Sequence, residues 1–389
     1  MGGPSSGNVD RVRHLARFPD IDVHVIVPNR KASKMPKIPQ ATLHTYESKP
    51  WPVYPAFHVP TRRGGRQIDE TISGIHPDVV FNTDLERGTF LSSFRRPGRS
   101  WARRHGVPYL GYYHTDFYGF AAAYPGWKHV VNFAVLPALR SIYQSPDLVI
   151  AASPTAALEV EKLRARRVTQ IPFDGVDTEA FTPAARDRQW LSGLIPGLGP
   201  QDQVILSFGR IAPEKHIEDT LTAFDAIPRQ PDSNGGARLW LLVVGEGDPA
   251  LERSLRRQAA QLDHCADVVF HGFLHGPERA RVLASADIYV LPSTHETFSI
   301  TTTEAMACGV PVVCARSGAM PTYVTEATTG FLHRPRDPLD QAQAMHRALC
   351  CDRQSIGRAA RQTVSDRFSH GTISLSLREL FYREAVQVT

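Results

Sequence analysis

The chain has 389 residues, of which 42% are hydrophobic and 21% are charged, and its formal net charge is +5. This length allows two domains with separate cores, and the composition is that of an ordinary soluble globular protein. The modest positive charge suits a phosphorylated ligand or an acidic surface and does not require nucleic acid as a partner.

The five cysteines all lie in the second half of the chain without regular spacing, which predicts reduced thiols in a cytoplasmic protein. No apolar run approaches the roughly 20 residues that a membrane-spanning helix needs. The first residues also lack the apolar core of a signal peptide. We therefore expect no stable membrane insertion.

The first half of the chain predicts alternating helices and strands. Helices are expected over residues 8–17, 100–105 and 128–145, and strands over 23–27, 76–81, 107–113 and 147–151. Residues 31–66 are rich in proline and polar side chains, and we expect them to form mostly loop.

The second half predicts a parallel sheet. Strands are expected over residues 204–209, 239–244, 268–270, 288–291, 312–314 and 330–332, and helical pattern dominates from residue 341 onward. The four β-branched residues from Ile300 to Thr303 oppose a helix. We still expect one there, because Gly309 provides a stop signal and two parallel strands need a crossover.

Two carboxylates flank the start of that helix, Glu296 in the loop before it and Glu304 two turns into it. In open α/β sheets, ligands bind at the carboxyl ends of the strands, where helix N-termini direct amides toward an anion. The amides of residues 297–300 therefore suit a phosphate, and the carboxylates suit sugar hydroxyls. Together these features predict a nucleotide sugar.

Glu296 and Glu304 are separated by seven residues, within Pro-Ser-x2-Glu-Thr-Phe and Glu-Ala-Met-Ala-x-Gly-x-Pro-Val-Val. Bare glutamate pairs at this spacing are common on solvated helices, but the surrounding sequence resembles the signature of the family 4 retaining glycosyltransferases. The resemblance covers almost the whole chain, most strongly from 204 to 330. It implies the α/β GT-B fold, in which two Rossmann-like domains face each other across a cleft.

The expected domains follow from this resemblance and from the loop-forming residues. Residues 1–180 are expected to form an acceptor-binding Rossmann-like domain, and 181–200, with Pro and Gly at both ends, a linker. Residues 201–366 are expected to bind the nucleotide sugar, and 367–389 to form a terminal helix that packs back on the first domain.

The start of the chain departs from the family pattern, which has a buried strand, a Gly-Gly loop and a helix. Gly2 and Gly3, which the resemblance assigns to donor binding, follow Met1 directly. The first strand is therefore expected to be absent. Its absence would leave a sheet position empty, expose apolar surface and lower the stability of the chain.

Residues 209–215 read Gly-Arg-Ile-Ala-Pro-Glu-Lys and resemble the family's Gly-Arg-x-x-x-Glu-Lys. In the family the arginine and the lysine, here Arg210 and Lys215, neutralise the departing diphosphate. The alternative is a solvated helix start with Glu214 paired to Lys215. Against it, Lys215 is the only lysine after Lys162 in this chain.

The resemblance implies further contacts with the donor. Glu296 is expected on the sugar hydroxyls, and Glu304 on the ribose diol. The other expected donor-binding residues are Gly209, Gly245, Gly272, Phe273, Leu274, Thr297, Phe298 and Ser299. The expected catalytic set is His114, Arg210, Lys215 and Glu296.

His114 opens a His-Thr-Asp-Phe tetrapeptide at the end of an expected strand. A histidine bonded to backbone is the commoner interpretation of such a residue, but the tetrapeptide resembles a family motif in which the histidine faces the transferred sugar. The residues expected to border the acceptor are Asp84, Glu86, Asp116 and Tyr118. Because cationic side chains already stabilise the leaving group, no metal or other cofactor is expected.

The acceptor is expected to be a small molecule and the donor to be UDP-linked. The tyrosines around His114 and the excess of arginine over lysine, 37 to 7, look similar to actinobacterial glycosyltransferases that act on the 2-deoxystreptamine ring of aminoglycosides. An aminocyclitol acceptor in antibiotic biosynthesis is therefore one hypothesis, and a lipid or saccharide acceptor is the alternative.

Three other functions fit parts of the sequence. A nucleotide-sugar epimerase or hydrolase would share the fold, and a binding protein without turnover would share the donor site. A basic surface module for lipid or nucleic acid would use the arginines around Trp101, which are Arg95, Arg96, Arg99, Arg103 and Arg104. Pro97 and Gly98 interrupt that run, so a solvated helix face is the preferred interpretation.

Overall fold

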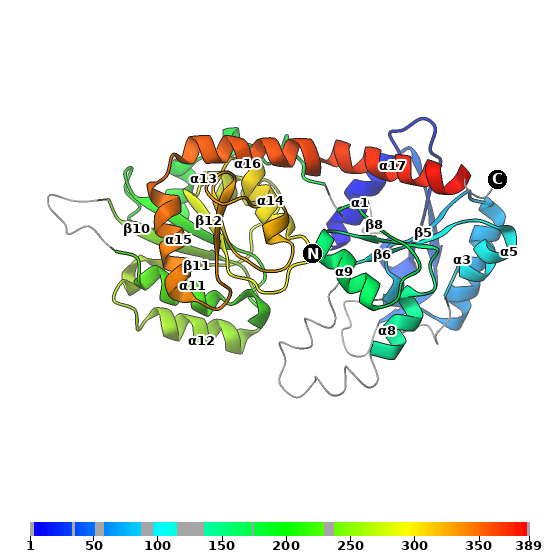
Figure 1. The fold of residues 1–389 in the computed structure, drawn as a ribbon, viewed down its shortest axis with the longest axis horizontal. Helices are drawn as coiled ribbons and strands as arrows, with labels where there is room; N and C mark the ends of the chain where they lie inside the picture. Colours follow the sequence, from blue (N-terminus) through cyan, green and yellow to red (C-terminus); the bar gives the residue numbers. More distant parts are fainter. Residues whose placement is uncertain are drawn as a thin grey trace. The chain divides into compact units, whose positions relative to one another are not determined.

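The computed structural model describes residues 4–32, 36–50, 58–86, 96–114, 136–172, 175–228 and 237–386. The chain divides into two compact units (Figure 1). Unit 1 comprises Met1–Gly175 together with His370–Thr389, and unit 2 comprises Val176–Ser369. Within the described residues, no helix has both the length and the apolar character that crossing a membrane requires.

Unit 2 is built on a six-stranded parallel sheet with the order β11-β10-β9-β12-β13-β14. The strands are β9 (Gln203–Phe208), β10 (Leu239–Val244), β11 (Val268–His271), β12 (Ile288–Leu291), β13 (Val312–Ala315) and β14 (Gly330–His333). Because helices cover both faces of such a sheet, its inner strands are continuous apolar runs. This is why the sequence locates all six strands.

Helices form a layer on each face of this sheet. Figure 1 shows α11 (Ile217–Asp225), α12 (Pro249–Ala259) and α15 (Pro338–Cys350) on one face, and α13 (Gly276–Ser285), α14 (Ile300–Ala307) and α16 (Arg353–Phe368) on the other. After β9, the chain continues to β10 and β11 on one side and to β12 and the later strands on the other. The carboxyl ends of β9 and β12 therefore meet at a topological switch point, where open α/β sheets bind ligands.

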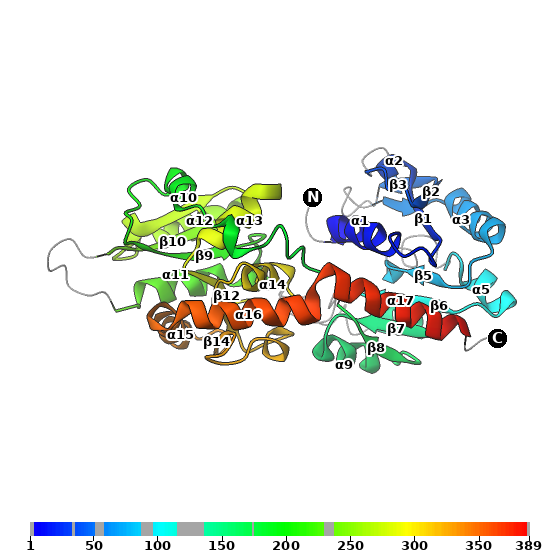
Figure 2. The ribbon, with the colours of Figure 1, turned by 90° about the horizontal axis from the view of Figure 1, so that it is seen from above.

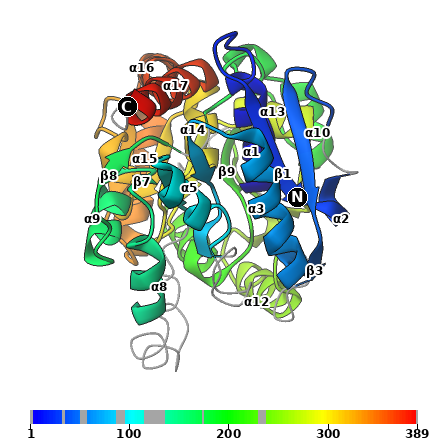
Figure 3. The same cartoon turned by 90° about the vertical axis from the view of Figure 1, so that its right-hand side faces the viewer.

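Unit 1 contains a four-stranded parallel sheet, β5-β6-β7-β8, and a separate parallel pair, β1 and β2. Figure 3 shows β1 and α3 toward one side of the unit and β7, β8 and α9 toward the other. The parallel strands are β1 (Val23–Pro28), β2 (Ala41–Tyr46), β5 (Val80–Asn82), β6 (Tyr109–Tyr113), β7 (Leu148–Ala151) and β8 (Val168–Gln170). Strands β1 and β5 are only half-buried along their length, whereas β6 and β7 are fully buried.

The helices of unit 1 pack around these sheets. They are α1 (Pro4–Leu15), α2 (Asn29–Ala32), α3 (Arg62–Ile75), α5 (Arg99–His105), α8 (Leu136–Tyr143), α9 (Pro154–Lys162) and α17 (His370–Val386). The terminal helix α17 packs against α1 (Figure 2). The Arg167 guanidinium binds the buried carboxylate of Glu384 through two hydrogen bonds of 2.8 and 2.9 Å, which also fixes α17 in this unit.

The expectation of loop over residues 31–66 is wrong in part. This segment contains β2, which runs parallel to β1 over six residues, and an antiparallel pair, β3 (Ser48–Pro50) with β4 (His58–Pro60). The β2 sequence Ala-Thr-Leu-His-Thr-Tyr is largely polar, because much of this strand faces solvent. Its hydrophobic pattern is therefore too weak to reveal a strand.

The linker expected over residues 181–200 is instead part of unit 2. It contains a 3-10 turn, η2 (Pro183–Ala185), and the helix α10 (Arg188–Leu194), and Leu191 and Ile195 are fully buried. The guanidinium groups of Arg186 and Arg188 bind the buried carboxylate of Asp287 at 3.2 and 3.3 Å. The proline and glycine residues in this segment mark turns within a packed element.

Asp287 joins three segments of unit 2, and we expect Asp287→Ala to lower the free energy of unfolding by roughly 3 kcal/mol. Its carboxylate also accepts the Val204 N–H at 2.8 Å and lies 3.4 Å from Arg353, so the substitution leaves several polar groups without their partner. Chemical denaturation measures the change. Asp366→Ala, which removes an exposed carboxylate bonded to Gln362, is the control and should change stability by less than about 0.5 kcal/mol.

Unit 1 should lose stability in mild acid. The His14 ring lies 4.5 Å from that of His370, and burial, assisted by that neighbour, lowers the pKa of His14 to about 4. Burial and His24 likewise lower the pKa of His44. The unfolded chain, with histidine pKa values near 6.5, therefore binds more protons than the fold. The thermal midpoint should be constant above about pH 6.5 and fall toward pH 4. The fall should be less steep in His14→Gln. An equally steep fall in that variant would contradict the lowered pKa of His14 as its cause.

Candidate active site

The loops after β9 and β10 pack backbone against backbone at the switch point. Gly245 has a φ of 158°, and a Cβ atom placed on it would lie 1.8 Å from the carbonyl oxygen of Gly209. One residue further, the Ile211 N–H donates to the Glu246 carbonyl at 2.9 Å. These contacts fix the path of Arg210, which lies between the two contact points.

Arg210 is held by an acidic residue of its own motif. Its guanidinium lies 2.7 Å from the carboxylate of Glu214, whose side chain is 4% exposed, while the Arg210 side chain is 63% exposed. The alternative of a solvated helix start assumed that Glu214 pairs with Lys215. Glu214 pairs with Arg210 instead. The buried carboxylate orients an arginine whose outer edge remains open to an anion.

Lys215 ends a 3-10 turn, η3 (Pro213–Lys215), and its ammonium contacts the Glu296 carboxylate. Both side chains are mostly buried, so solvent weakens this attraction less than it would at the surface. Two residues that are 81 positions apart in the sequence, and that were expected on the diphosphate and on the sugar, are therefore neighbours.

His216 connects the same two loops and is a residue that the sequence analysis did not identify. It has a left-handed φ of 49°, and its Nε2 lies 2.9 Å from the Thr294 hydroxyl. The Ser293 hydroxyl also donates to the Glu214 carbonyl at 3.1 Å. These bonds tie the loop carrying Lys215 to the loop carrying Glu296, although only the position of His216 beside Lys215 hinted at such a role.

A tight turn after β13 supports Glu296 from another side. The Ala319 N–H donates to the Glu296 carbonyl at 2.9 Å. Gly318, the residue before Ala319, has a φ of 54°, and a Cβ atom on it would lie 2.5 Å from the same Glu296 carbonyl oxygen. Only glycine fits this position, because it needs both the left-handed conformation and the close approach.

Helix α14 begins where the sequence predicts and tolerates its β-branched residues by burying them. Thr302 and Thr303 are fully buried, and the Thr303 hydroxyl donates to the Ile300 carbonyl at 2.8 Å. Ser299 precedes the helix with a φ of 68°, and its hydroxyl pairs with that of Thr302 instead of capping an amide. The first amides of α14 are therefore not capped by the Ser299 side chain, an arrangement that suits an anion.

Two of the residues expected to bind the donor are engaged within the protein. The Phe298 side chain is buried against Tyr323 and Phe368, so only its backbone can contact a ligand. The Glu304 carboxylate is buried and contacts the guanidinium of Arg279 on α13. The sequence analysis missed Arg279, because nothing in its local sequence separates it from the other arginines.

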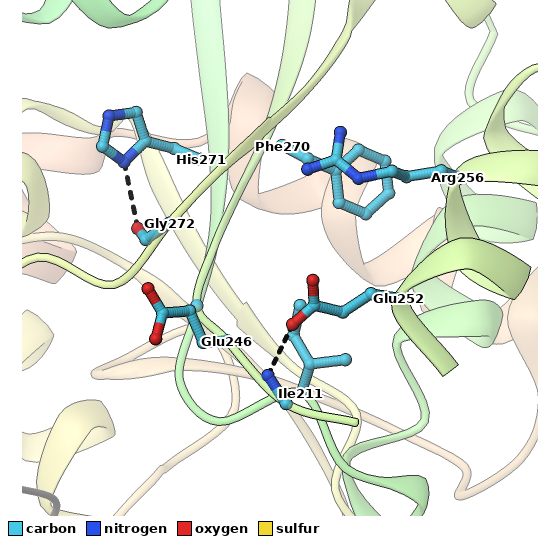
Figure 4. Close-up of a pocket in the computed structure, with 9 residues that line it drawn as sticks. Ile211, Glu246, Glu252, Arg256, Phe270, His271 and Gly272 are labelled. Carbon is cyan, nitrogen blue, oxygen red and sulfur yellow. Dashed lines mark hydrogen bonds between the residues drawn. The ribbon is translucent and has the colours of Figure 1, made fainter. Parts of the chain in front are cut away.

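A cavity of about 380 Å³ opens at the carboxyl ends of β10 and β11, next to these loops (Figure 4). Gly245, Ile211 and Gly272 contribute to its wall. Beyond Gly272, the Phe273 ring packs against that of Phe208, with 5.3 Å between centroids, and Leu274 is buried. Of the expected Gly272–Phe273–Leu274 segment, Gly272 is the residue that lines the cavity.

Three of the site residues expected in unit 1, which are His114, Asp84 and Glu86, lie within the described residues. His114 follows β6, with its ring 4.8 Å from that of Tyr112, and Asp84 follows β5. Glu86, expected to border the acceptor, is instead buried and accepts a hydrogen bond from Tyr143, whose pKa rises well above its usual value because of burial and this carboxylate. Gly2, Gly3, Asp116 and Tyr118 lie outside the described residues.

The structure argues against the basic surface module. Trp101 is 3% exposed and belongs to the core of unit 1. Arg96 donates to the Ser141 hydroxyl at 2.7 Å and Arg99 to the Ser145 carbonyl at 2.9 Å, so both support helix packing. Among the described residues, no three His, Cys, Asp or Glu side chains are grouped so that they could hold a metal ion.

Comparison with known proteins supports the motifs. Residues 1–180 match the model described as Glycosyltransferase Family 4, and residues 195–363 match Glycosyl transferases group 1. Two GDP-mannose-dependent alpha-mannosyltransferases, from Mycolicibacterium smegmatis and Mycobacterium tuberculosis, are 33% and 34% identical over 75% and 79% of this chain and 70% and 73% of their own lengths. The chain belongs to the family 4 glycosyltransferases.

Three further proteins are similar to this glycosyltransferase in sequence or in fold. A sulfoquinovosyl transferase of Arabidopsis thaliana is 28% identical over 73% of the chain, and the chain spans about half, 54%, of that enzyme. Sucrose-phosphate synthase from Thermosynechococcus elongatus superposes with a TM-score of 0.76 at 22% identity, covering 100% of this chain and 95% of the synthase. Anabaena HepE in complex with UDP superposes at 0.73 with 18% identity, covering 98% of both chains. These structures confirm the GT-B fold.

Close packing at Gly245 should be essential to this glycosyltransferase. Gly245→Ala forces a methyl group against the Gly209 carbonyl, and we expect a loss of about 1–3 kcal/mol in unfolding free energy together with weaker nucleotide binding. Gly193→Ala is the matched control, because Gly193 lies in α10 with nothing within 4 Å of an added Cβ. It should stabilise by about 0.5–1 kcal/mol. Equal behaviour of the two variants in chemical denaturation would show that the loops adapt.

Proposed function

We propose that this glycosyltransferase transfers a hexosyl group from a nucleotide sugar to a hydroxyl group of a polyol or saccharide acceptor, with retention of the anomeric configuration. The observation that carries the proposal is the convergence of Arg210, Lys215 and Glu296 at the switch point of unit 2. Two cations beside a carboxylate suit a ligand that joins a diphosphate to a sugar.

The chemistry asks the protein for positioning and charge stabilisation. As the bond between the anomeric carbon and the phosphate oxygen breaks, negative charge grows on the diphosphate, where Arg210 and Lys215 stabilise it. The acceptor hydroxyl attacks from the same face and passes its proton to a phosphate oxygen, so no protein nucleophile is needed. When Lys215 turns to the diphosphate, Glu296 becomes available to the sugar hydroxyls. This route requires no metal.

The residues on the acceptor side belong to the same proposal. His114 contributes an imidazole to the sugar, and Asp84, Asp116 and Tyr118 border the acceptor. Glu86 is withdrawn from this set, because its carboxylate is buried and bonded by Tyr143.

The proposed class of acceptor is taken from the names of the similar proteins. They include a phosphatidylinositol dimannoside mannosyltransferase of Mycobacterium tuberculosis, 28% identical over 70% of this chain and 67% of its own length. They also include a D-inositol 3-phosphate glycosyltransferase of Stackebrandtia nassauensis, 37% identical over 54% of this chain and 47% of its own length. These names support a saccharide, an inositol or a lipid carrying either. The aminocyclitol acceptor and the role in antibiotic biosynthesis find no support among these relatives.

A donor–acceptor screen tests the transfer. The purified protein is incubated with UDP-glucose, UDP-N-acetylglucosamine or GDP-mannose, together with inositol phosphate, mannosides, phosphatidylinositol mannosides or an aminocyclitol. Mass spectrometry should detect a hexose on an acceptor, and nuclear magnetic resonance should show the anomeric configuration of the donor in the product. Hydrolysis or epimerisation without a glycosylated product would favour the alternative enzymes, and an inverted product would refute retention.

Lys215→Ala should lower kcat/KM for transfer by about 10²–10³-fold, because it removes a charge that stabilises the leaving diphosphate. Lys162→Ala is the control. The Lys162 side chain contacts Glu159 at the protein surface and is 70% exposed. Lys162→Ala should keep the thermal midpoint within a few degrees, and Lys215→Ala should remain folded. A protein that binds nucleotide sugars without turnover would instead show an affinity change in Lys215→Ala and no product in any variant.

A further inference from the structure

The cavity beside β10 and β11 is next to the proposed diphosphate site. Ile211 lines it and directly follows Arg210, and the Ile211 N–H donates to the carbonyl of Glu246, another lining residue. A nucleoside diphosphate whose phosphates contact Arg210 can therefore place its base in this cavity. Binding of a base in this cavity rests on the function proposed above.

Of the two carboxylates that line the cavity, one is committed to the fold. The Glu252 carboxylate accepts the Gly247 N–H at 2.6 Å, which closes the loop before α12. Glu246 is bound more loosely, since its Oε1 accepts the Phe273 N–H at a long 3.4 Å. Figure 4 shows the Glu246 carboxylate turned toward Gly272, which also lines the cavity. It is the carboxylate placed to contact a ligand there.

Gly272 leaves the space that this carboxylate occupies. A Cβ atom on Gly272 would lie 3.3 Å from Oε1 of Glu246, closer than side chains normally approach. On the other side, the Arg256 guanidinium is held over the Phe270 ring, 4.7 Å from its centroid, which fixes its plane at the cavity wall. The cavity thus offers an acceptor of two hydrogen bonds and a planar donor.

We propose that Glu246 makes the site select a guanine nucleotide, in place of the uracil nucleotide expected from the sequence. Guanine presents two adjacent donors, N1–H and the N2 amine, which match the two oxygens of one carboxylate. Its O6 and N7 acceptors match a guanidinium such as that of Arg256. Uracil presents a single N3–H between two carbonyl oxygens, and these oxygens repel a carboxylate.

Nucleotide binding without an acceptor tests this selection directly. Isothermal titration calorimetry compares GDP, IDP and UDP, since the hypoxanthine base of IDP lacks only the N2 amine of guanine. The wild-type protein should bind GDP about tenfold more tightly than IDP, because one charge-assisted hydrogen bond is lost. It should bind UDP more weakly still.

Glu246→Gln should abolish the preference for guanine. The glutamine amide presents one acceptor and one donor, so GDP affinity should fall about tenfold, the GDP-to-IDP ratio should approach one, and UDP affinity should stay equal or rise. Glu278→Gln is the matched control, because it removes one exposed carboxylate from the same unit. It should keep the wild-type order and thermal midpoint.

The results separate this inference from the proposed function. If wild-type protein binds UDP as tightly as GDP, or if Glu246→Gln keeps the GDP-to-IDP ratio, the selection by Glu246 is wrong while nucleotide binding stands. If no nucleotide binds at millimolar concentration, both proposals fail. If Glu246→Gln unfolds, the comparison of GDP with IDP on the wild-type protein still decides whether the N2 amine is recognised.

Discussion

Three cations near the switch point of unit 2 are each paired with a carboxylate of the protein. The pairs are Arg210 with Glu214, Lys215 with Glu296, and Arg279 with Glu304. Lys215 and Arg279 are mostly buried, and a buried cation without a partner would carry a large desolvation cost, which their carboxylate partners offset. The carboxylates also restrict the side chains to few conformations, which is the preorganisation that electrostatic catalysis requires.

If a diphosphate binds here as proposed, it competes with carboxylates of the protein. Arg210 can contact both at once, because its guanidinium presents several donors and its outer edge is exposed. Lys215 has a compact charge and is mostly buried with Glu296. A ligand on Lys215 therefore changes what Glu296 can bind. In the proposed function, this coupling links recognition of the leaving group to recognition of the sugar.

The elements located correctly from the sequence are those whose local pattern of residues matches their burial in the structure. The inner strands of unit 2 are largely apolar because both faces of the sheet are covered, and the start of α14 follows from the elements on either side. Sequence reasoning failed where a residue acts through a distant partner. Arg279 and His216 matter because of Glu304 and Thr294, 25 and 78 positions away. Local sequence cannot reveal such contacts, and for the same reason residues 181–200 look like a linker although Asp287 anchors them.

The route of the chain through the two units determines the order in which they can be completed during synthesis. Unit 2 is continuous from residue 176 to 369, whereas unit 1 needs α17. Arg378 of α17 binds Asp20, 358 positions earlier. A ribosome therefore releases everything that unit 2 requires before it releases the last helix of unit 1. The half of the protein that is made first finishes folding last, and its early segments must stay free of aggregation in the meantime.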